Sequence, residues 1–267
     1  MSDFAYWRQQ NEKPLFPQVD TERPEQRRMM GKVLVVGGNK GMFFTVANVM
    51  QEAEKLGFQE VHAVMPDSLR NTVPTTPQIF FAEAEASGAF GRNALPELLR
   101  QADWADVVLV VGDLGKNAET SIVLVEFLTK VEKPVYVMRD AIDVASVDAA
   151  NWSLRETETV LLATMPQLQK LFRNLYYPKM ITLSMPTNQL VETLHKFTLS
   201  FELTVATFHN GLLIVADKGE IVTTDLKYTP YEPLTVWSGG LLVKMAAFGW
   251  WNPGQPRLNI IATACLK

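Results

Sequence analysis

Hydrophobic positions along the chain follow two alternating patterns. Continuous apolar runs that end in glycine, such as KVLVVGG at 32–38 and DVVLVVGDLG at 106–115, are typical of strands buried on both faces of a parallel sheet. Segments with apolar residues at helical spacing lie between them. One is FFTVANVMQEAEKLG at 43–57, where we expect Gly57 to cap a helix. The alternation predicts a doubly wound, mostly parallel α/β sheet with right-handed crossovers.

The same alternation continues towards the C-terminus. We expect strands at 60–66, 133–144 and 157–165, helices at 95–102, 118–131, 166–175 and 188–201, and a hairpin at 212–224 around Asp217-Lys218-Gly219. The segment TVWSGGLLVKM at 235–245 predicts a glycine turn that opens into an apolar helix.

Residues 1–30 differ from the rest of the chain. Three prolines, Pro14, Pro17 and Pro24, together with a run of charges, predict an irregular arm that leads into or wraps the domain. Residues 31–267 contain no obvious linker, low-complexity tract or short repeat. We therefore expect an N-terminal arm, 1–30, and a single domain, 31–267.

Composition narrows the class of protein. A chain of 267 residues with 47% hydrophobic content can bury a large core, and its formal charge of −4 gives no bulk attraction to nucleic acid or to acidic membranes. Cys265 is the only cysteine, so no intrachain disulfide or cysteine cluster can form. The polar N-terminus does not resemble a secretory signal, and no apolar run approaches the roughly 18 residues of a membrane helix. We expect a cytoplasmic protein.

Three glycine turns follow predicted strands or precede predicted helices: GGNKG at 37–41, GDLGKN at 112–117 and SGGLL at 238–242. In open α/β sheets, ligands collect beyond the carboxyl ends of the strands, so these turns are candidates for one shared crevice. Glycine lets the backbone approach a ligand, and a following helix directs free N–H groups at an anion. None of the turns is a Walker A motif or a GxGxxG fingerprint. For any single turn, a tight strand-end turn without a ligand is the alternative interpretation.

The order of the segments, from Gly31 to the C-terminus, resembles the ADP/ATP-dependent NAD(P)H-hydrate dehydratase family of the ribokinase-like superfamily. The segment GKVLVVGGNKGM resembles the first strand and glycine turn of the family, with Gly38 and Asn39 at its Gly-Ser pair. The resemblance implies a ribokinase-like, three-layer α/β/α fold with a mostly parallel central sheet.

Two further strand ends carry the resemblance. ADVVLVVGDLG resembles the strand that ends in Gly-Pro-Gly-Leu-Gly and keeps Gly112, with Asp113 displacing the Pro-Gly step. KPVYVMRDAIDV resembles Pro-Val-Val-Leu-Asp-Ala-Asp-Ala-Leu, with Asp140 kept and Met138 in place of the first acid. The resemblance implies nucleotide contacts at Ser238, Gly239, Gly240 and His209, and substrate contacts at Gly38, Asn39, Gly112, Asp140, Thr164 and Gln167.

The sequence departs from the family where the family carries out chemistry. Thr164 stands at a histidine, Gln167 at a glutamate, His209 at a lysine, Trp237 at a glycine, and Gly240 at the catalytic aspartate. In the superfamily this acid takes a proton from a substrate hydroxyl while helix N–H groups hold the phosphate. Loss of a positioned general base typically lowers the rate by about 10²- to 10⁴-fold.

Other residues could compensate for the missing acid. Asp113 lies inside a glycine turn and is the candidate replacement base, whereas Asp140 is more typical of a cap. His209 could contact phosphate or be a satisfied strand-end histidine. His62, His195 and His209 fall in different predicted elements, and no cluster of acids accompanies them at ligand spacing, so we expect no metal site built from side chains.

Three hypotheses remain. The preferred one is a ribokinase-like protein with a degenerate active site and a residual ligand-binding or assembly role. The second is an active nucleotide-dependent hydro-lyase, or a carbohydrate-type small-molecule kinase, that uses a displaced acid. The third is a structural or interaction protein in which Trp237 fills the nucleotide position. The expected ligands are ADP or ATP, with Mg²⁺, or a dinucleotide, and we expect a homo-oligomer.

Overall fold

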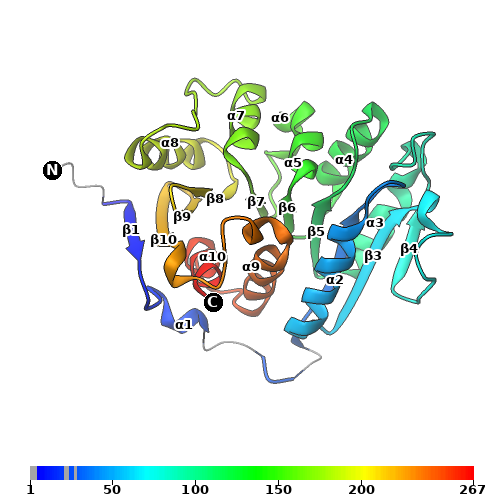
Figure 1. Ribbon diagram of the computed structural model, residues 1–267, viewed down its shortest axis with the longest axis horizontal. Helices are drawn as coiled ribbons and strands as arrows, with labels where there is room; N and C mark the ends of the chain where they lie inside the picture. Colours follow the sequence, from blue (N-terminus) through cyan, green and yellow to red (C-terminus); the bar gives the residue numbers. More distant parts are fainter. Residues whose placement is uncertain (1–4, 21–23, 27–28) are drawn as a thin grey trace.

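The computed structural model describes residues 5–20, 24–26 and 29–267, and these form a three-layer α/β/α arrangement (Figure 1). The described residues contain one ten-stranded sheet in the order β1-β10-β9-β8-β7-β6-β5-β2-β3-β4. Strand β9 runs antiparallel to both of its neighbours, and the other neighbouring pairs are parallel. The strands are β1 (Trp7–Gln10), β2 (Lys32–Gly37), β3 (Glu60–Pro66), β4 (Ile79–Ala82), β5 (Val107–Gly112), β6 (Val135–Met138), β7 (Thr159–Leu162), β8 (Thr204–His209), β9 (Leu212–Asp217) and β10 (Glu220–Asp225).

Helices cover both faces of the sheet. The helices are α1 (Pro17–Asp20), α2 (Phe44–Leu56), α3 (Leu95–Trp104), α4 (Ala118–Lys130), α5 (Asp140–Ala145), α6 (Ala149–Trp152), α7 (Met165–Asn174), α8 (Thr187–Ser200), α9 (Gly240–Trp251) and α10 (Arg257–Leu266). One hydrophobic core lies under α2, α9 and α10, and a second lies under α3 to α8. In β2, Val33 and Val35 face the first core while Leu34 and Val36 face the second, because side chains alternate along a strand. The predicted mostly parallel α/β sheet is confirmed.

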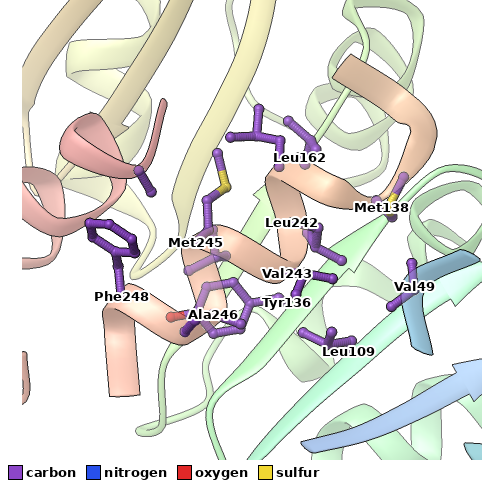
Figure 2. Close-up of a cluster of buried hydrophobic side chains, with 14 of the residues drawn as sticks. Val49, Leu109, Tyr136, Met138, Leu162, Leu242, Val243, Met245, Ala246 and Phe248 are labelled. Atoms are coloured by element: carbon purple, nitrogen blue, oxygen red, sulfur yellow. The ribbon is translucent and has the colours of Figure 1, made fainter. Parts of the chain in front are cut away.

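Helix α9 is the central element of the first core. Its residues are buried on nearly every side, as expected for a helix without a polar face. Figure 2 shows Leu242, Val243 and Met245 of α9 among side chains from β5, β6 and β7. The packing against α2 and α10 fixes the position at which α9 begins.

Most predicted elements are present, and three differ from expectation. The strand predicted at 133–144 was wrong in length: β6 ends at Met138 because Arg139 takes φ 57° and ψ −147°, and α5 starts at Asp140. Strand β4 was not predicted, because its four residues are too few to show a clear alternation of apolar and polar positions. The arm expected to be irregular contains β1.

Strand β1 lies at one edge of the sheet and pairs in parallel with β10. The Trp7 indole N–H donates to Thr223 Oγ1 at 3.0 Å, and the Gln10 amide donates to Thr224 Oγ1 at 3.1 Å and to the Ala262 carbonyl at 2.7 Å. The arm therefore attaches to both the sheet and α10.

The packing of α10 leads to a prediction for Cys265, which is buried in the core. Burial raises the pKa of the Cys265 thiol to about 12, so little thiolate exists at pH 8, and the reagent has no access. We expect 5,5′-dithiobis(2-nitrobenzoate) to leave the native protein unlabelled at pH 8 and to label one thiol per chain in guanidinium chloride. Rapid, complete labelling of protein with an unchanged circular dichroism spectrum would contradict this packing.

Candidate functional site

The three glycine turns lie around the N-terminal half of α2. At the carboxyl end of β2, the Gly38 N–H donates to the Gly112 carbonyl at 3.0 Å, and the Asn39 amide donates to the Asp113 carbonyl at 2.6 Å. The third glycine turn contacts α2 at Asn48, whose side-chain amide donates to the Ser238 carbonyl at 2.7 Å. The first two turns are therefore joined directly, and α2 connects them to the third.

Asp113 is buried at this junction, with 3% of its surface exposed. Its Oδ2 accepts from the Thr45 backbone N–H at 3.0 Å, in the first turn of α2, and its Oδ1 pairs with Arg139 Nη2 at 2.9 Å. A carboxylate at this place stabilises the positive end of α2. Both oxygens already bind protein groups and the carboxylate is buried, so a substrate hydroxyl has little access to it.

Asp140 binds the amide groups that follow β5. Its Oδ1 accepts from the Asp113 N–H at 2.7 Å and its Oδ2 from the Leu114 N–H at 2.9 Å. This is the capping role expected for Asp140. Gly112, with φ 94°, leaves room for the carboxylate, because a Cβ there would clash with Asp140 Oδ1.

Arg139 holds a backbone conformation that belongs almost only to glycine, with φ 57° and ψ −147°. The side-chain amide of Gln167 donates to the Arg139 carbonyl at 2.6 Å and to Asp143 Oδ2 at 2.9 Å. Gln167 and Thr164 also form a capping box at the start of α7. Thr164 and Gln167 therefore fix the start of α7 and the backbone of Arg139. The sequence did not single out Arg139 as a site residue, although a cation directly after a predicted strand was a visible signal.

Helix α9 starts at Gly240, and no side chain among the described residues caps its first N–H groups. Gly239 has φ 107° and packs so closely on Val49 of α2 that a Cβ would clash. An uncapped, fixed helix N-terminus is an anion-binding geometry.

Glu52 of α2 lies beside this helix start. Its Oε2 is 3.9 Å from the position that a Cβ of residue 240 would take, and its Oε1 pairs with Lys55 at 2.9 Å. Lys244, one turn into α9, lies 5.4 Å from the ring centre of Tyr231. Burial lowers the pKa of Lys244, while the charge of Glu52 opposes that shift. No sequence signal links Glu52 to residue 240, because the two are far apart in the chain.

The two remaining candidate residues, His209 and Trp237, contact other parts of the protein. His209 is buried, and its Nε2 lies 2.7 Å from the Met185 carbonyl, to which it can donate a hydrogen bond, as a satisfied strand-end histidine would. Trp237 is partly buried against the first core. In the described ranges, no three His, Cys, Asp or Glu residues gather as they would around a metal ion. The described helices are too short or too polar to cross a bilayer.

Comparison with curated proteins gives a partial match. No family model matches the chain. The bifunctional NAD(P)H-hydrate repair enzyme Nnr of Moorella thermoacetica is 28% identical over 130 residues, which are 48% of this chain and 24% of that enzyme. The match thus spans about a quarter of the curated relative.

Solved structures match over nearly the whole chain. A ribokinase-like superfamily protein of Enterococcus faecalis has a TM-score of 0.67 at 15% identity, covering 97% of this chain and 86% of that one. The ADP/ATP-dependent NAD(P)H-hydrate dehydratase of Bacillus subtilis, crystallised with ATP/Mg²⁺ and soaked with CoA, has a TM-score of 0.58 at 13% identity over 95% and 86%. Bacillus subtilis pyridoxal kinase, solved with ADP, has 0.51 at 11% over 87% and 88%. The chain has the ribokinase-like fold, and its resemblance to NAD(P)H-hydrate dehydratases is confirmed.

The backbone of Arg139 can be tested by paired substitutions. Arg139→Gly and Arg139→Ala both remove the ion pair with Asp113, but only glycine relieves the strained φ and ψ. We expect the glycine variant to be more stable than the alanine variant by about 1–2 kcal/mol in urea unfolding.

Arg100 is the matched control, since it lies exposed within α3. There the ordinary order holds, and Arg100→Ala is expected to be more stable than Arg100→Gly by about 1 kcal/mol. If the alanine variant were more stable than the glycine variant at position 139 as well as at position 100, the backbone of Arg139 would not be strained.

Proposed function

We propose that this ribokinase-like chain binds a nucleotide or dinucleotide at the start of α9 and lacks the dehydration or phosphoryl-transfer activity of its relatives. One observation carries the proposal: α9 begins with uncapped N–H groups at Gly240, yet residue 240 supplies no carboxylate. The similarity to a hydrate repair enzyme and to nucleotide-dependent enzymes of the same fold supports this ligand class.

The start of α9 favours anion binding for two reasons. Its twelve residues align their peptide dipoles, so the N-terminus carries about half a positive charge. Gly239 and Gly240 present no side chain, so a phosphate can approach the backbone closely. The buried flanks of α9 keep these N–H groups in place before the ligand arrives.

The proposed loss of turnover rests on the absence of a carboxylate at residue 240 and on the contacts of Asp113 and Asp140. Gly240 has no group that accepts a proton, and Asp113, the candidate replacement base, already binds Arg139 and the Thr45 N–H. Asp140 likewise accepts two backbone hydrogen bonds. General base catalysis needs a carboxylate within reach of the substrate hydroxyl, and both aspartates are instead engaged with protein groups.

Glu52 supports a second candidate function, an active enzyme with a displaced acid, because its carboxylate lies beside the missing side chain of residue 240. In the preferred proposal, Glu52 has another use. One carboxylate together with phosphate oxygens is a donor set that Mg²⁺ accepts, so Glu52 would hold the magnesium ion of a magnesium nucleotide. That ion supplies positive charge at the phosphates.

The test combines binding with turnover. We expect ADP or ATP with Mg²⁺ to raise the free energy of unfolding by about 2.7 kcal/mol at a hundredfold excess over the dissociation constant, measured by thermal shift and calorimetry. Hydrated NADH supplied with the same nucleotides is expected to give no regenerated NADH by absorbance. Glu52→Gln should weaken the magnesium-dependent part of binding by about tenfold, because the neutral amide is a poorer magnesium ligand.

Two outcomes would contradict the preferred proposal. NADH regeneration by the native protein that disappears in Glu52→Gln would establish the displaced-acid enzyme. A complete lack of stabilisation by ADP, ATP or a dinucleotide would favour the structural role in which Trp237 fills the site.

Gly240→Asp restores an acid at the position of the family's catalytic aspartate. Turnover gained by this variant alone would identify residue 240 as the position of the lost base.

A further inference from the structure

A cavity lies away from the glycine turns. It has a volume of about 530 Å³ and is bounded by α7 and the segment 176–181 that follows it. Thr164 and Gln167 mark the end of α7 at the candidate functional site, whereas this cavity opens beside Arg173, near the other end of the helix. Its volume is within the range of small-molecule sites, roughly 300–1,000 Å³.

Aromatic side chains make the floor of this cavity rigid. Phe172 has 2% of its surface exposed and stacks on Phe197 with ring centres 4.2 Å apart, while Tyr177 meets Phe172 edge-on at 4.9 Å. The Gln169 amide donates to the Ile181 carbonyl at 2.6 Å, which fastens the outer wall to α7. The cavity is therefore formed by packed elements.

Two large apolar side chains at the rim are left in solvent. Tyr176 is 92% exposed and Met180 is 83% exposed. Tyr176 also has φ 53°, in the left-handed region that bulky residues rarely adopt. An exposed aromatic ring in a strained conformation beside a cavity is a surface on which a planar group can stack.

The charges around the cavity are of one sign. Arg173 and Lys179 line it, no Asp or Glu does, and neither cation forms an ion pair with a described residue. The nearby acid Glu192 lines the adjoining cavity, and its carboxylate pairs with Lys196 at 2.5 Å. The hydrogen bond from Lys196 and the charge of Lys179 both help to lower the pKa of Glu192. Neither lining cation is within ion-pairing distance of a described acid, so both can still pair with an anion.

We propose that this cavity binds a small aromatic anion, a carboxylate or sulfonate whose ring packs on Tyr176 above the aromatic floor and whose charge pairs with Arg173 and Lys179. Guanidinium groups recognise carboxylates and related oxyanions through two parallel hydrogen bonds, and aromatic rings supply apolar area with little flexibility. The site is separate from the proposed nucleotide site, so each can be tested without the other.

The probe for this site is 1-anilinonaphthalene-8-sulfonate, followed by fluorescence titration, and the comparator is N-phenyl-1-naphthylamine, which lacks the sulfonate. We expect saturable binding of the sulfonate at one site per chain. The double variant Arg173→Gln/Lys179→Gln should weaken sulfonate binding by at least about tenfold, because charge-assisted hydrogen bonds are lost, and should change binding of the neutral comparator less than about twofold. Tyr176→Ser should weaken both probes.

The matched control is Lys130→Gln on α4, an exposed cation outside the cavity. It should leave both probes unaffected, and circular dichroism should show that every variant is folded. Sulfonate affinity that is unchanged in the double variant, or absent in the native protein, would overturn the proposal. Displacement of the sulfonate by ATP would also overturn it, since the probe would then occupy the nucleotide site.

Discussion

The ion pair between Asp113 and Arg139 is the constraint on which the site depends. It lies where β5 and β6 end, and the Asp113 carboxylate also holds the first turn of α2. Gln167 fastens Arg139 to the start of α7, and Asp140 fastens the amides after β5. In open α/β sheets, ligands commonly bind beyond the carboxyl ends of the strands. Here the amide groups at two of these strand ends bind carboxylates of the protein itself. This arrangement is accompanied by a strained backbone at Arg139.

Local signals predicted the fold well. The buried runs KVLVVGG and DVVLVVG became β2 and β5, and Gly57 caps α2 in the left-handed conformation, as expected. The Asp217-Lys218-Gly219 hairpin is also present, with Lys218 and Gly219 at positive φ. The pattern missed the end of β6, because a positive φ at an arginine has no local signature.

Long-range contacts at the site were less predictable. The capping role of Asp140 and the satisfied state of His209 followed from their places at strand ends. The engagement of Asp113 by Arg139 and Thr45, and the approach of Glu52 to Gly240, join segments distant in sequence. Such contacts depend on how helices pack on the sheet, which periodicity alone does not specify.

The pairing of β1 with β10 has a consequence for biosynthesis. Trp7 bonds to a residue 216 positions later, so β1 pairs with a strand that is translated long after it. At about 5–20 residues per second, that partner follows roughly ten to forty seconds later. Until then the arm has no sheet edge to join, and such a distant contact forms slowly. Strand β1 therefore joins the sheet only after β10 has been translated.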